Sequence, residues 1–435
     1  MNICVFGLWH LGLVTSACLA KLGHTVVGLD FNKKIVKGLQ NKKTPLFEPG
    51  LNELILESMQ TGKLSFTYEA KEALKKAKVL WFAFDTPIDD KDAADILFLE
   101  NNFRKIMPYF NNGLKIVISS QAPVGFVNKI ENLFVEYHPN KKCHFACSPE
   151  NLKLGKALDA FLNPDRIIIG VRNQESKEAF IPLFSSITAR LQWMKVESAE
   201  MTKHAINSFL ATSVCFANEI SYICEQVGAD AKEVELGLKT ESRIGPKAYL
   251  RPGAAFSGGT LARDINFLIR LSSKFKLPSY LIKAVKHSNL FHRNWIEVKC
   301  RQALGSLKKK TVAILGLTYK PGTDTLRRSP AVELAKLLQA KGALVNSFDP
   351  VIKSIPKDLS KIICLKNSAG KAILNADVVI IATECPEFLQ FGEDVINLMK
   401  NKIIIDPNGF IVKLIEHKDL SYISVGKSFD KESVE

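Results

Sequence analysis

The sequence of 435 residues lacks several features of membrane, secreted and metal-binding proteins. No apolar run approaches the ~20 residues that a helix needs to span a bilayer, so we expect no membrane partner. No basic leader precedes the first apolar run, residues 3–6, so we expect no signal peptide. The nine cysteines include no Cys-x-x-Cys pair. This pattern favours reduced thiols in a cytoplasmic protein, with neither a disulfide framework nor a metal site.

A dense basic block is also missing, although the formal net charge is +15. Without a basic-aromatic stripe or a nucleic-acid-binding motif, this charge predicts a lysine-rich surface that attracts small anions. We therefore expect no nucleic acid as a partner. The composition, with 46% hydrophobic and 24% charged residues, is that of an ordinary globular protein. The length predicts two or three domains.

Short apolar runs alternate with helical patterns through the first part of the chain. This alternation is typical of a parallel, doubly wound α/β sheet. The predicted strands are residues 3–6, 25–29, 79–84, 115–119, 143–146 and 166–170, and the first predicted helix is residues 13–22.

The middle of the chain changes to long helical patterns. From Glu200 to Val227 no proline or glycine interrupts the sequence, which predicts a helix of roughly 40 Å. A second helical stretch, residues 264–307, has a break near Pro278.

The alternation of strands and helices then returns. Strands are predicted at residues 311–315, 344–348, 376–383 and 403–405, and a helix begins at residues 331–338. The segment ADVVIIATECPEF, which begins at Ala376, is similar to the segment AKVLWFAFDTPID, which begins at Ala77. This internal similarity predicts two Rossmann-like domains that flank a helical centre.

The first turn of the chain resembles a dinucleotide-binding loop. It reads Gly7, Leu8, Trp9, His10, Leu11 and Gly12. Gly7 and Gly12 supply the tight turn and the close approach of the helix. Trp9 replaces the middle glycine, and its indole crowds the pyrophosphate unless it points away. Asp30, 18 residues after Gly12, would accept hydrogen bonds from ribose hydroxyls and repel a 2′-phosphate, so NAD is favoured over NADP.

Three further clusters contain charged or amide side chains. A loop after a predicted strand contains Glu150. Lys203 and Asn207 are four residues apart and so share one face of the long predicted helix. The third cluster, residues 243–264, is rich in glycine, which permits tight backbone around a ligand. It ends at Asp264, which is placed to cap the next helix.

The motifs that carry a family resemblance run in order through nearly the whole chain: GLWHLG, PLFEPGL, DTP, SSQAPVG, SPENL, PDRIIIG, AEMTKHAINSFLATSVCFANEI, RIG, RPGAAFSGGTLARD and LGLTYKPGTDTLRRSP. The sequence resembles the UDP-glucose/GDP-mannose dehydrogenase family, most closely its UDP-glucose 6-dehydrogenase branch. The resemblance implies two Rossmann-like doubly wound parallel-sheet domains joined by a long central helix and a helical dimerisation domain. The implied domains are residues 1–196 for NAD, 197–305 for dimerisation and the catalytic loop, and 306–435 for the UDP-sugar.

The resemblance also implies a role for each residue of a catalytic set. Lys203 and Asn207 would stabilise the alkoxide that forms as hydride leaves the sugar carbon. Asp264 would hold the water or lysine that takes the proton, and Glu150 would be the general base of a hydrolytic step. Alcohol oxidation needs this chemistry, because the hydroxyl proton requires a base and the developing oxyanion requires donors.

Two binding sets are implied in the same way, and a UDP-sugar is favoured as the substrate. Arginine and lysine suit its phosphates. The cofactor set is Gly7, Leu8, Trp9, His10, Leu11, Gly12, Asp30, Thr86, Pro87, Gln121, Arg263 and Arg327. The substrate set is Asn151, Leu152, Lys153, Arg243, Tyr249, Leu250, Arg251, Gly253, Tyr319 and Lys320. Arg243 would reach the sugar nucleotide of the neighbouring subunit in a homodimer.

The sequence departs from the family at the residue that forms the covalent intermediate. The family's loop ends in GGSC, whereas this chain has Thr260 at the cysteine position. A thiolate forms at accessible pH, but a threonine alkoxide does not form without a strong base. We therefore expect the covalent route to be absent or very slow. Further departures at Gln121, Asn151 and Thr325 leave the reacting sugar open.

Several outcomes remain open at this point. In the first outcome, the enzyme makes a uronic acid through a hydrated aldehyde, and Glu150 or Asp264 assists the hydration. Alternatively, it stops after one oxidation at an aldehyde or keto sugar, or another thiol, Cys147 or Cys215, replaces the missing one. A non-catalytic binder of nucleotide sugars is a further alternative, although a pure binder needs none of the catalytic set.

Overall fold

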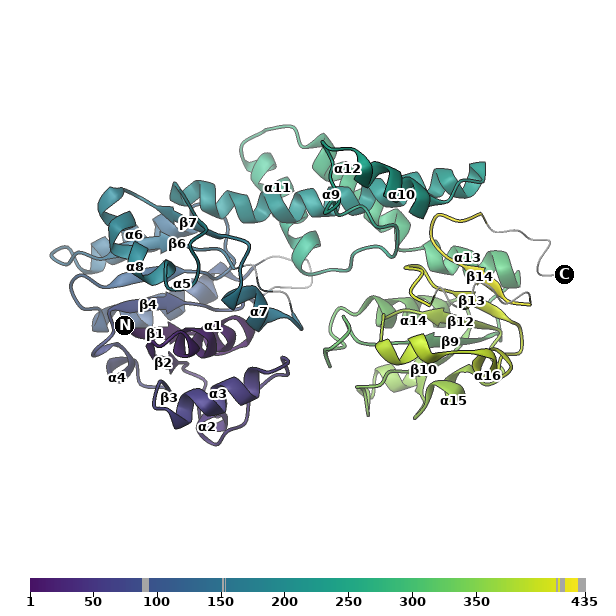
Figure 1. Cartoon of the computed structure of the whole chain (residues 1–435), viewed down its shortest axis with the longest axis horizontal. Helices are drawn as coiled ribbons and strands as arrows, with labels where there is room; N and C mark the ends of the chain where they lie inside the picture. The colour runs from purple at the N-terminus through teal and green to yellow at the C-terminus, as the bar shows by residue number, and fades with distance from the viewer. Residues whose placement is uncertain (88–93, 151, 153, 412–413, 415–418, 429–435) are drawn as a thin grey trace. The chain divides into compact units, whose positions relative to one another are not determined.

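The computed structural model describes residues 1–435 except 88–93, 151, 153, 412–413, 415–418 and 429–435. The chain folds as two compact units, Met1–Ala205 and Ile206–Glu435, and each has its own sheet (Figure 1). The boundary between the units falls inside the long helix α9 (Val196–Val227). Among the described residues, no helix is both long enough and apolar enough to span a membrane.

The first unit is built on a sheet with the strand order β3-β2-β1-β4-β5-β6-β7-β8. The β6–β7 pair is antiparallel, whereas the other pairs of this sheet are parallel. The strands are β1 (Asn2–Phe6), β2 (Thr25–Leu29), β3 (Leu64–Thr67), β4 (Val79–Phe82), β5 (Lys115–Ile118), β6 (His144–Cys147), β7 (Ile167–Val171) and β8 (Leu191–Met194). The helices before α9 are α1 (His10–Lys21), α2 (Lys33–Gln40), α3 (Leu51–Gln60), α4 (Ala70–Leu74), α5 (Ile96–Ile106), α6 (Phe126–Tyr137), α7 (Ala157–Leu162) and α8 (Gln174–Phe184).

Helix α1 is buried on nearly every side. Residues 11–20 of this helix are all buried, because small and apolar side chains surround the whole helix and no polar face is present. The hydroxyl of Ser16 donates its hydrogen bond back to the carbonyl of Gly12, at 2.7 Å. The packing therefore fixes the N-terminus of α1 beside the carboxyl end of β1.

The second unit contains a parallel sheet with the strand order β11-β10-β9-β12-β13-β14. Its strands are β9 (Thr311–Leu315), β10 (Leu344–Phe348), β11 (Ile363–Leu365), β12 (Val378–Ile381), β13 (Ile403–Ile405) and β14 (Ser421–Ile423). Its helices after α9 are α10 (Ala231–Thr240), α11 (Thr260–Lys274), α12 (Tyr280–His292), α13 (Trp295–Leu304), α14 (Pro330–Ala340), α15 (Ala369–Ile373) and α16 (Glu393–Ile396).

The two sheets share the strand order of the Rossmann fold, in which the first strand lies at the centre and the chain winds outward on both sides. The two similar segments that begin at Ala77 and Ala376 contain equivalent strands. These are β4, which pairs with β1, and β12, which pairs with β9. The predicted fold class, two Rossmann-like folds with a long helix between them in the chain, is therefore confirmed.

The long helix α9 has 32 residues and so extends roughly 48 Å. It begins four residues before the predicted start at Glu200. The second helical stretch, predicted at residues 264–307 with one break, is three separate helices, α11, α12 and α13. A small apolar cluster of Ala211, Cys215, Ile265 and Val285 joins α9, α11 and α12.

Candidate functional site

The turn between β1 and α1 requires glycine at both of its ends. Gly7 has a φ of +101°, and a Cβ there would lie 2.9 Å from the ring of Phe84. A Cβ on Gly12 would lie 1.6 Å from the carbonyl oxygen of Gly7. The middle position is Trp9, whose side chain is 48% exposed. The indole is therefore half exposed, and the glycines at both ends keep the tight turn that dinucleotide-binding loops use.

The carboxylate of Asp30 stands at the mouth of this turn. It follows β2, and its two oxygens accept hydrogen bonds from the backbone N–H groups of Leu8 and Asn32, each at 2.8 Å. These bonds fix the direction of the carboxylate. The arrangement fits a dinucleotide, and the contact of Asp30 with a ribose stays a prediction.

The second unit repeats this turn, but its next helix begins further along the chain. Gly316 follows β9 with a φ of +87°. The buried carboxylate of Asp349 accepts hydrogen bonds from both Leu317 N–H and Thr318 N–H, at 2.7 and 3.0 Å. Helix α14 begins only at residue 330, and the side chain of Ser329 caps it. Because α1 begins at His10, directly after the first turn, whereas α14 begins well away from Gly316, the first unit offers the better phosphate cradle.

The ends of neighbouring strands bring two predicted cofactor residues together. The hydroxyl of Thr86 donates to the carbonyl of Gln121 at 2.6 Å, which joins the loops that follow β4 and β5. Pro87, the next residue, is exposed. A pocket of about 310 Å³ is lined by Gln121, Lys203 and Pro149, among others. Predicted cofactor and catalytic residues thus line one pocket of the first unit.

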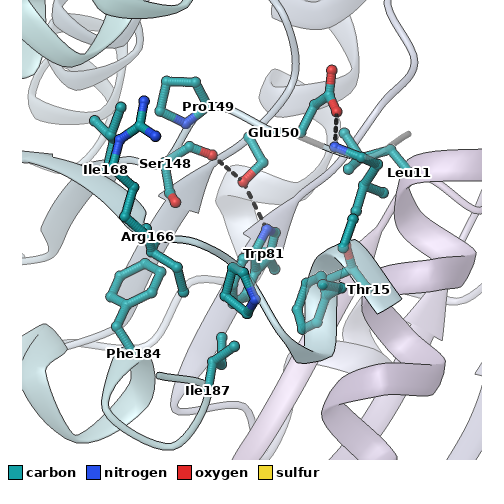
Figure 2. A pocket seen from close by; sticks show the side chains of 16 residues that line it. Leu11, Thr15, Trp81, Ser148, Pro149, Glu150, Arg166, Ile168, Phe184 and Ile187 are labelled. Atoms are coloured by element: carbon teal, nitrogen blue, oxygen red, sulfur yellow. Dashed lines mark hydrogen bonds between the residues drawn. The ribbon is translucent and has the colours of Figure 1, made fainter. Parts of the chain in front are cut away.

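A hydrogen-bond chain fixes the strand ends beneath Glu150 (Figure 2). The indole N–H of Trp81 donates to the hydroxyl of Ser119 at 2.8 Å, and this hydroxyl donates to the carbonyl of Ser148 at 2.7 Å. These residues line an adjoining pocket of about 520 Å³, whose walls include Phe184. Because these hydrogen bonds connect the ends of β4, β5 and β6, they support the loop that carries Glu150.

Lys203 and Glu150 form the first pair of the predicted catalytic set. The ammonium of Lys203 donates to the backbone carbonyl of Glu150 at 2.6 Å and lies 3.5 Å from its carboxylate. The Lys203 side chain is only 11% exposed, so it is not a solvated surface charge. The Glu150 carboxylate also accepts the N–H of Leu152 at 2.8 Å. Asn151 and Lys153 lie outside the described residues.

Asn207 and Asp264 form the second pair. The side-chain amide of Asn207 donates to the carboxylate of Asp264 at 2.5 Å, and both side chains are buried. The prediction that Asp264 caps a helix is wrong. Helix α11 begins at Thr260, so Asp264 is its fifth residue, and the N-cap position is Gly259. The chain is already helical there because Gly259, with a φ of +105°, makes the turn into α11 five residues before the predicted cap at Asp264.

Thr260, which replaces the expected cysteine, is the exposed first residue of α11. A Cβ on the preceding Gly259 would lie 3.4 Å from the hydroxyl of Tyr319, so this predicted substrate residue lies beside the loop. Two other thiols were candidates to replace the cysteine. Burial raises the pKa of Cys147 well above its ordinary value, and burial raises the pKa of Cys215 to about 11. Neither is a ready thiolate near neutral pH, which argues against that alternative.

The loop around Arg251 is held by polar contacts from several elements of the second unit. The guanidinium of Arg251 donates to the carbonyl of Asn408 at 2.8 Å and lies 3.0 Å from the carboxylate of Glu384. The N–H of Gly253 donates to the side chain of Asn218 at 3.1 Å. A Cβ on Gly253 would lie 2.4 Å from the side-chain oxygen of Asn408, so a larger residue would displace this side chain.

The other predicted substrate residues of the second unit differ in exposure. Tyr249 is 58% exposed, and Leu250 is partly buried. The Arg243 side chain is 86% exposed and pairs with Glu241 at 2.9 Å. Lys320 is exposed on the loop after β9. Of the predicted cofactor residues, Arg263 lies in the first turn of α11, and Arg327 lies on the loop before α14.

Two buried glutamates that position the site were not assigned a role from the sequence. The Glu48 carboxylate lies 2.9 Å from Nε2 of His10 and accepts N–H groups of Gly155 and Ala157, at 2.9 and 2.8 Å. It therefore joins the dinucleotide turn to the segment after Glu150 and caps α7. The signal in the sequence was the motif FEPGL, in which a glutamate stands among apolar and turn residues.

Glu200 is the second of these glutamates. Its carboxylate accepts the N–H groups of Gly125 and Val127, at 2.7 and 2.9 Å, and so caps α6. Burial raises the pKa of Glu200, while the two N–H groups oppose this rise. Beside it, Nε2 of His204 lies 3.1 Å from the carbonyl of Ala122. Both contacts fasten the loop of Gln121 to helix α9.

Comparison with known proteins defines the class. Residues 1–188 match the NAD binding domain of the UDP-glucose/GDP-mannose dehydrogenase family, residues 197–290 match its central domain, and residues 313–413 match its UDP binding domain. The first unit is therefore an NAD-binding Rossmann unit. The chain belongs to the UDP-glucose/GDP-mannose dehydrogenase family, whose members are NAD-dependent nucleotide-sugar dehydrogenases.

Individual relatives match over almost the whole chain. The UDP-glucose 6-dehydrogenase of Rickettsia prowazekii is 32% identical over 436 residues, which cover 98% of this chain and 99% of that protein. The solved UDP-glucose dehydrogenase of Pyrobaculum islandicum superimposes with a TM-score of 0.89 at 29% identity, with 98% of each chain covered. The UDP-D-ManNAc dehydrogenase of Pyrococcus horikoshii gives a TM-score of 0.86 at 25% identity, with 99% and 100% covered.

Proposed function

We propose that the protein oxidises the C6 hydroxyl of UDP-glucose with NAD, in the manner of a UDP-glucose 6-dehydrogenase. The observation that carries this proposal is the pair of contacts on successive turns of α9. Lys203 is held against Glu150, and Asn207 is held against Asp264. Within each pair, a carboxylate is held beside a hydrogen-bond donor, and general acid–base chemistry requires groups positioned in this way. The relative from R. prowazekii supports glucose as the sugar, whereas the relative from P. horikoshii makes an N-acetylated sugar the main competitor.

The first oxidation removes a proton from the hydroxyl and a hydride from the carbon. When bound, NAD accepts the hydride. The Lys203 ammonium and the Asn207 amide stabilise the alkoxide, because both present N–H donors where negative charge develops. The Asp264 carboxylate takes the hydroxyl proton through a bound water. The product of this step is the C6 aldehyde.

The second oxidation proceeds without a covalent link to the protein. Glu150 takes a proton from a water that adds to the aldehyde and returns it to the former carbonyl oxygen, so that a gem-diol forms. Loss of a second hydride and a second proton from the gem-diol gives the carboxylic acid, and UDP-glucuronate is the final product. Each turnover then consumes one UDP-glucose, two NAD and one water.

A second candidate is an enzyme that stops at the aldehyde or at a keto sugar. Thr260 favours it, because a hydroxyl at this position captures an aldehyde far less readily than a thiolate does. The raised pKa values of Cys147 and Cys215 leave no ready thiolate at these two positions.

The deciding experiment counts NADH formed per UDP-glucose consumed and identifies the sugar product by mass spectrometry. Two NADH and a uronate support the main proposal. One NADH and a carbonyl product support the second candidate. A panel of UDP- and GDP-sugars in the same assay identifies the sugar. Absence of NADH with every sugar, together with tight sugar binding, would identify a non-catalytic binder.

We also propose a homodimer formed along α9. Phe209, Phe216 and Ile223 are 71, 47 and 58% exposed. They recur every seven residues, or about two turns, so they lie on one face of the helix. An apolar stripe of this kind favours association with a second copy. In this dimer the exposed Arg243 reaches the sugar nucleotide of the neighbouring subunit, where its guanidinium suits a phosphate.

A further inference from the structure

An acidic side chain occupies the N-terminus of helix α1. Asp85 lies on the loop after β4, the strand next to β1 in the sheet. Its carboxylate accepts a hydrogen bond from the backbone N–H of Leu11 at 3.0 Å. Leu11 is the second residue of α1, and its N–H is one of those that no carbonyl within the helix can satisfy. The N-cap residue, Trp9, gives no side-chain cap, and the first turn of α1 contains no acidic residue of its own.

The N–H groups at this position are the ones a Rossmann turn uses for the diphosphate of its cofactor. They point out of the helix end, and the helix dipole adds to their attraction for an anion. A carboxylate bound to Leu11 N–H therefore stands where a diphosphate oxygen would accept the same hydrogen bond. One N–H cannot serve both acceptors fully, and the two anions repel each other at this distance.

We propose that Asp85 sets the cofactor affinity of this protein by acting as an internal competitor of the diphosphate. Without cofactor, the carboxylate of Asp85 caps α1. When NAD binds, Asp85 releases Leu11 N–H to the diphosphate, and the contact forms again when the dinucleotide leaves. The proposal rests on the NAD site in the first turn. Because both redox forms carry the same diphosphate, Asp85 weakens NAD and NADH by the same factor and so promotes release of the product NADH.

A merely structural role makes a different prediction. If Asp85 only caps α1, its removal loosens the turn, and dinucleotide binding becomes weaker or stays the same. If Asp85 competes with the diphosphate, its removal strengthens binding of ligands that contain the diphosphate and leaves other ligands unchanged. The sign of the change in affinity therefore separates the two roles.

The experiment measures binding by the full-length protein of NADH, NAD and ADP-ribose, by fluorescence and calorimetry, with adenosine as a ligand that lacks phosphate. The variants are Asp85→Asn and Asp85→Ser. The control is Glu175→Gln, which removes one exposed negative charge from the first turn of another helix, α8. We expect both Asp85 variants to bind all three dinucleotide ligands roughly tenfold more tightly, about 1.4 kcal/mol. The control and the binding of adenosine should remain unchanged.

Equal or weaker binding of NADH by both Asp85 variants would overturn the inference and leave the proposed activity intact. An equal gain for adenosine would also overturn it, because the effect would then not depend on the diphosphate. Absence of NADH binding in the wild type and in every variant would overturn the cofactor site and the inference together. A urea denaturation curve for each variant shows that the compared proteins are folded.

Discussion

The side-chain amide of Asn207 donates a hydrogen bond to the carboxylate of Asp264, and both residues are buried. The two residues are 57 positions apart, on α9 and α11. A buried carboxylate is costly unless hydrogen bonds satisfy it, so this amide orients Asp264 as well as stabilising it. The hydrogen bond satisfies two polar side chains that are buried where α9 and α11 meet.

Replacement of Asp264 by asparagine tests its proposed role in proton transfer. Asp264→Asn keeps the size of the side chain and loses the proton acceptor, so we expect kcat to fall ~10²- to 10⁴-fold. The affinity for NADH should be unchanged, and both quantities can be measured by steady-state kinetics and fluorescence titration. A variant with unchanged kcat and lower stability to urea would show that Asp264 only fastens the two helices.

Replacement of Thr260 by cysteine tests the consequence of the missing thiol. Thr260→Cys places a thiol at the exposed N-terminus of α11, where the helix dipole favours the thiolate. We expect iodoacetamide to modify one more site than in the wild type, in which Cys364 is the exposed thiol of the described residues. We also expect faster formation of uronate. Thr260→Ser is the matched control, and equal alkylation and product rates in both variants would contradict this expectation.

Glu48 is expected to stabilise the first unit through its three polar contacts. Glu48→Gln removes the charge that faces His10 and puts an N–H₂ group against one of the two N–H donors, Gly155 or Ala157, which bind different oxygens of the carboxylate. The free energy of unfolding should fall by about 2 kcal/mol, measured by urea denaturation. Glu53→Gln, on the exposed face of α3, is the control and should change stability by less than ~0.5 kcal/mol. Equal stability of both variants would contradict the proposed role.

The stability of the second unit should depend on pH through His292. Burial lowers the pKa of His292 below its ordinary value of 6.5, although the carbonyl of Gly253 and the charge of Glu225 oppose this shift. Between the two pKa values the unfolded chain binds a proton that the folded chain does not bind. The free energy of unfolding is therefore highest above about pH 6.5. It falls as the pH drops towards the pKa that His292 has in the folded state.

The measurement is the free energy of unfolding of wild type and His292→Gln at pH 7.5 and pH 5.5. We expect the wild type to lose up to ~1.4 kcal/mol more per pH unit than the variant in this range. His287→Gln, an exposed position on the same helix, should keep the wild-type slope. If the stability of His292→Gln changed with pH as steeply as that of the wild type, the pH dependence would belong to other groups.

The proposed dimer is tested at the centre of the apolar stripe. Phe216→Arg places a charge between Phe209 and Ile223, and we expect the protein to elute as a monomer in size-exclusion chromatography with light scattering. Activity should fall with dimer content if Arg243 acts across the interface. Val135→Arg, at an exposed position on α6, is the control and should remain dimeric. A monomeric wild type would refute the dimer directly.

The interior of the fold was predictable from the sequence because each interior strand is an apolar run with neighbours on both sides. Residues 311–315, 344–348 and 403–405 were predicted with the bounds that the structure has. The strands that were missed, β3, β8, β11 and β14, are the edge strands of the two sheets. An edge strand has a neighbour on one side only and so needs no continuous apolar run, which is why the pattern did not reveal it.

The sequence by itself determined the family, the NAD-binding turn and the replacement of cysteine by Thr260, because these depend on residue type and order along the chain. Only the tertiary structure decided which polar groups meet. It joined Asn207 to Asp264, Lys203 to Glu150, and Asp85 to Leu11. Each of these pairs is distant in sequence, and no local pattern encodes a hydrogen bond that forms only when separate strands and helices pack together.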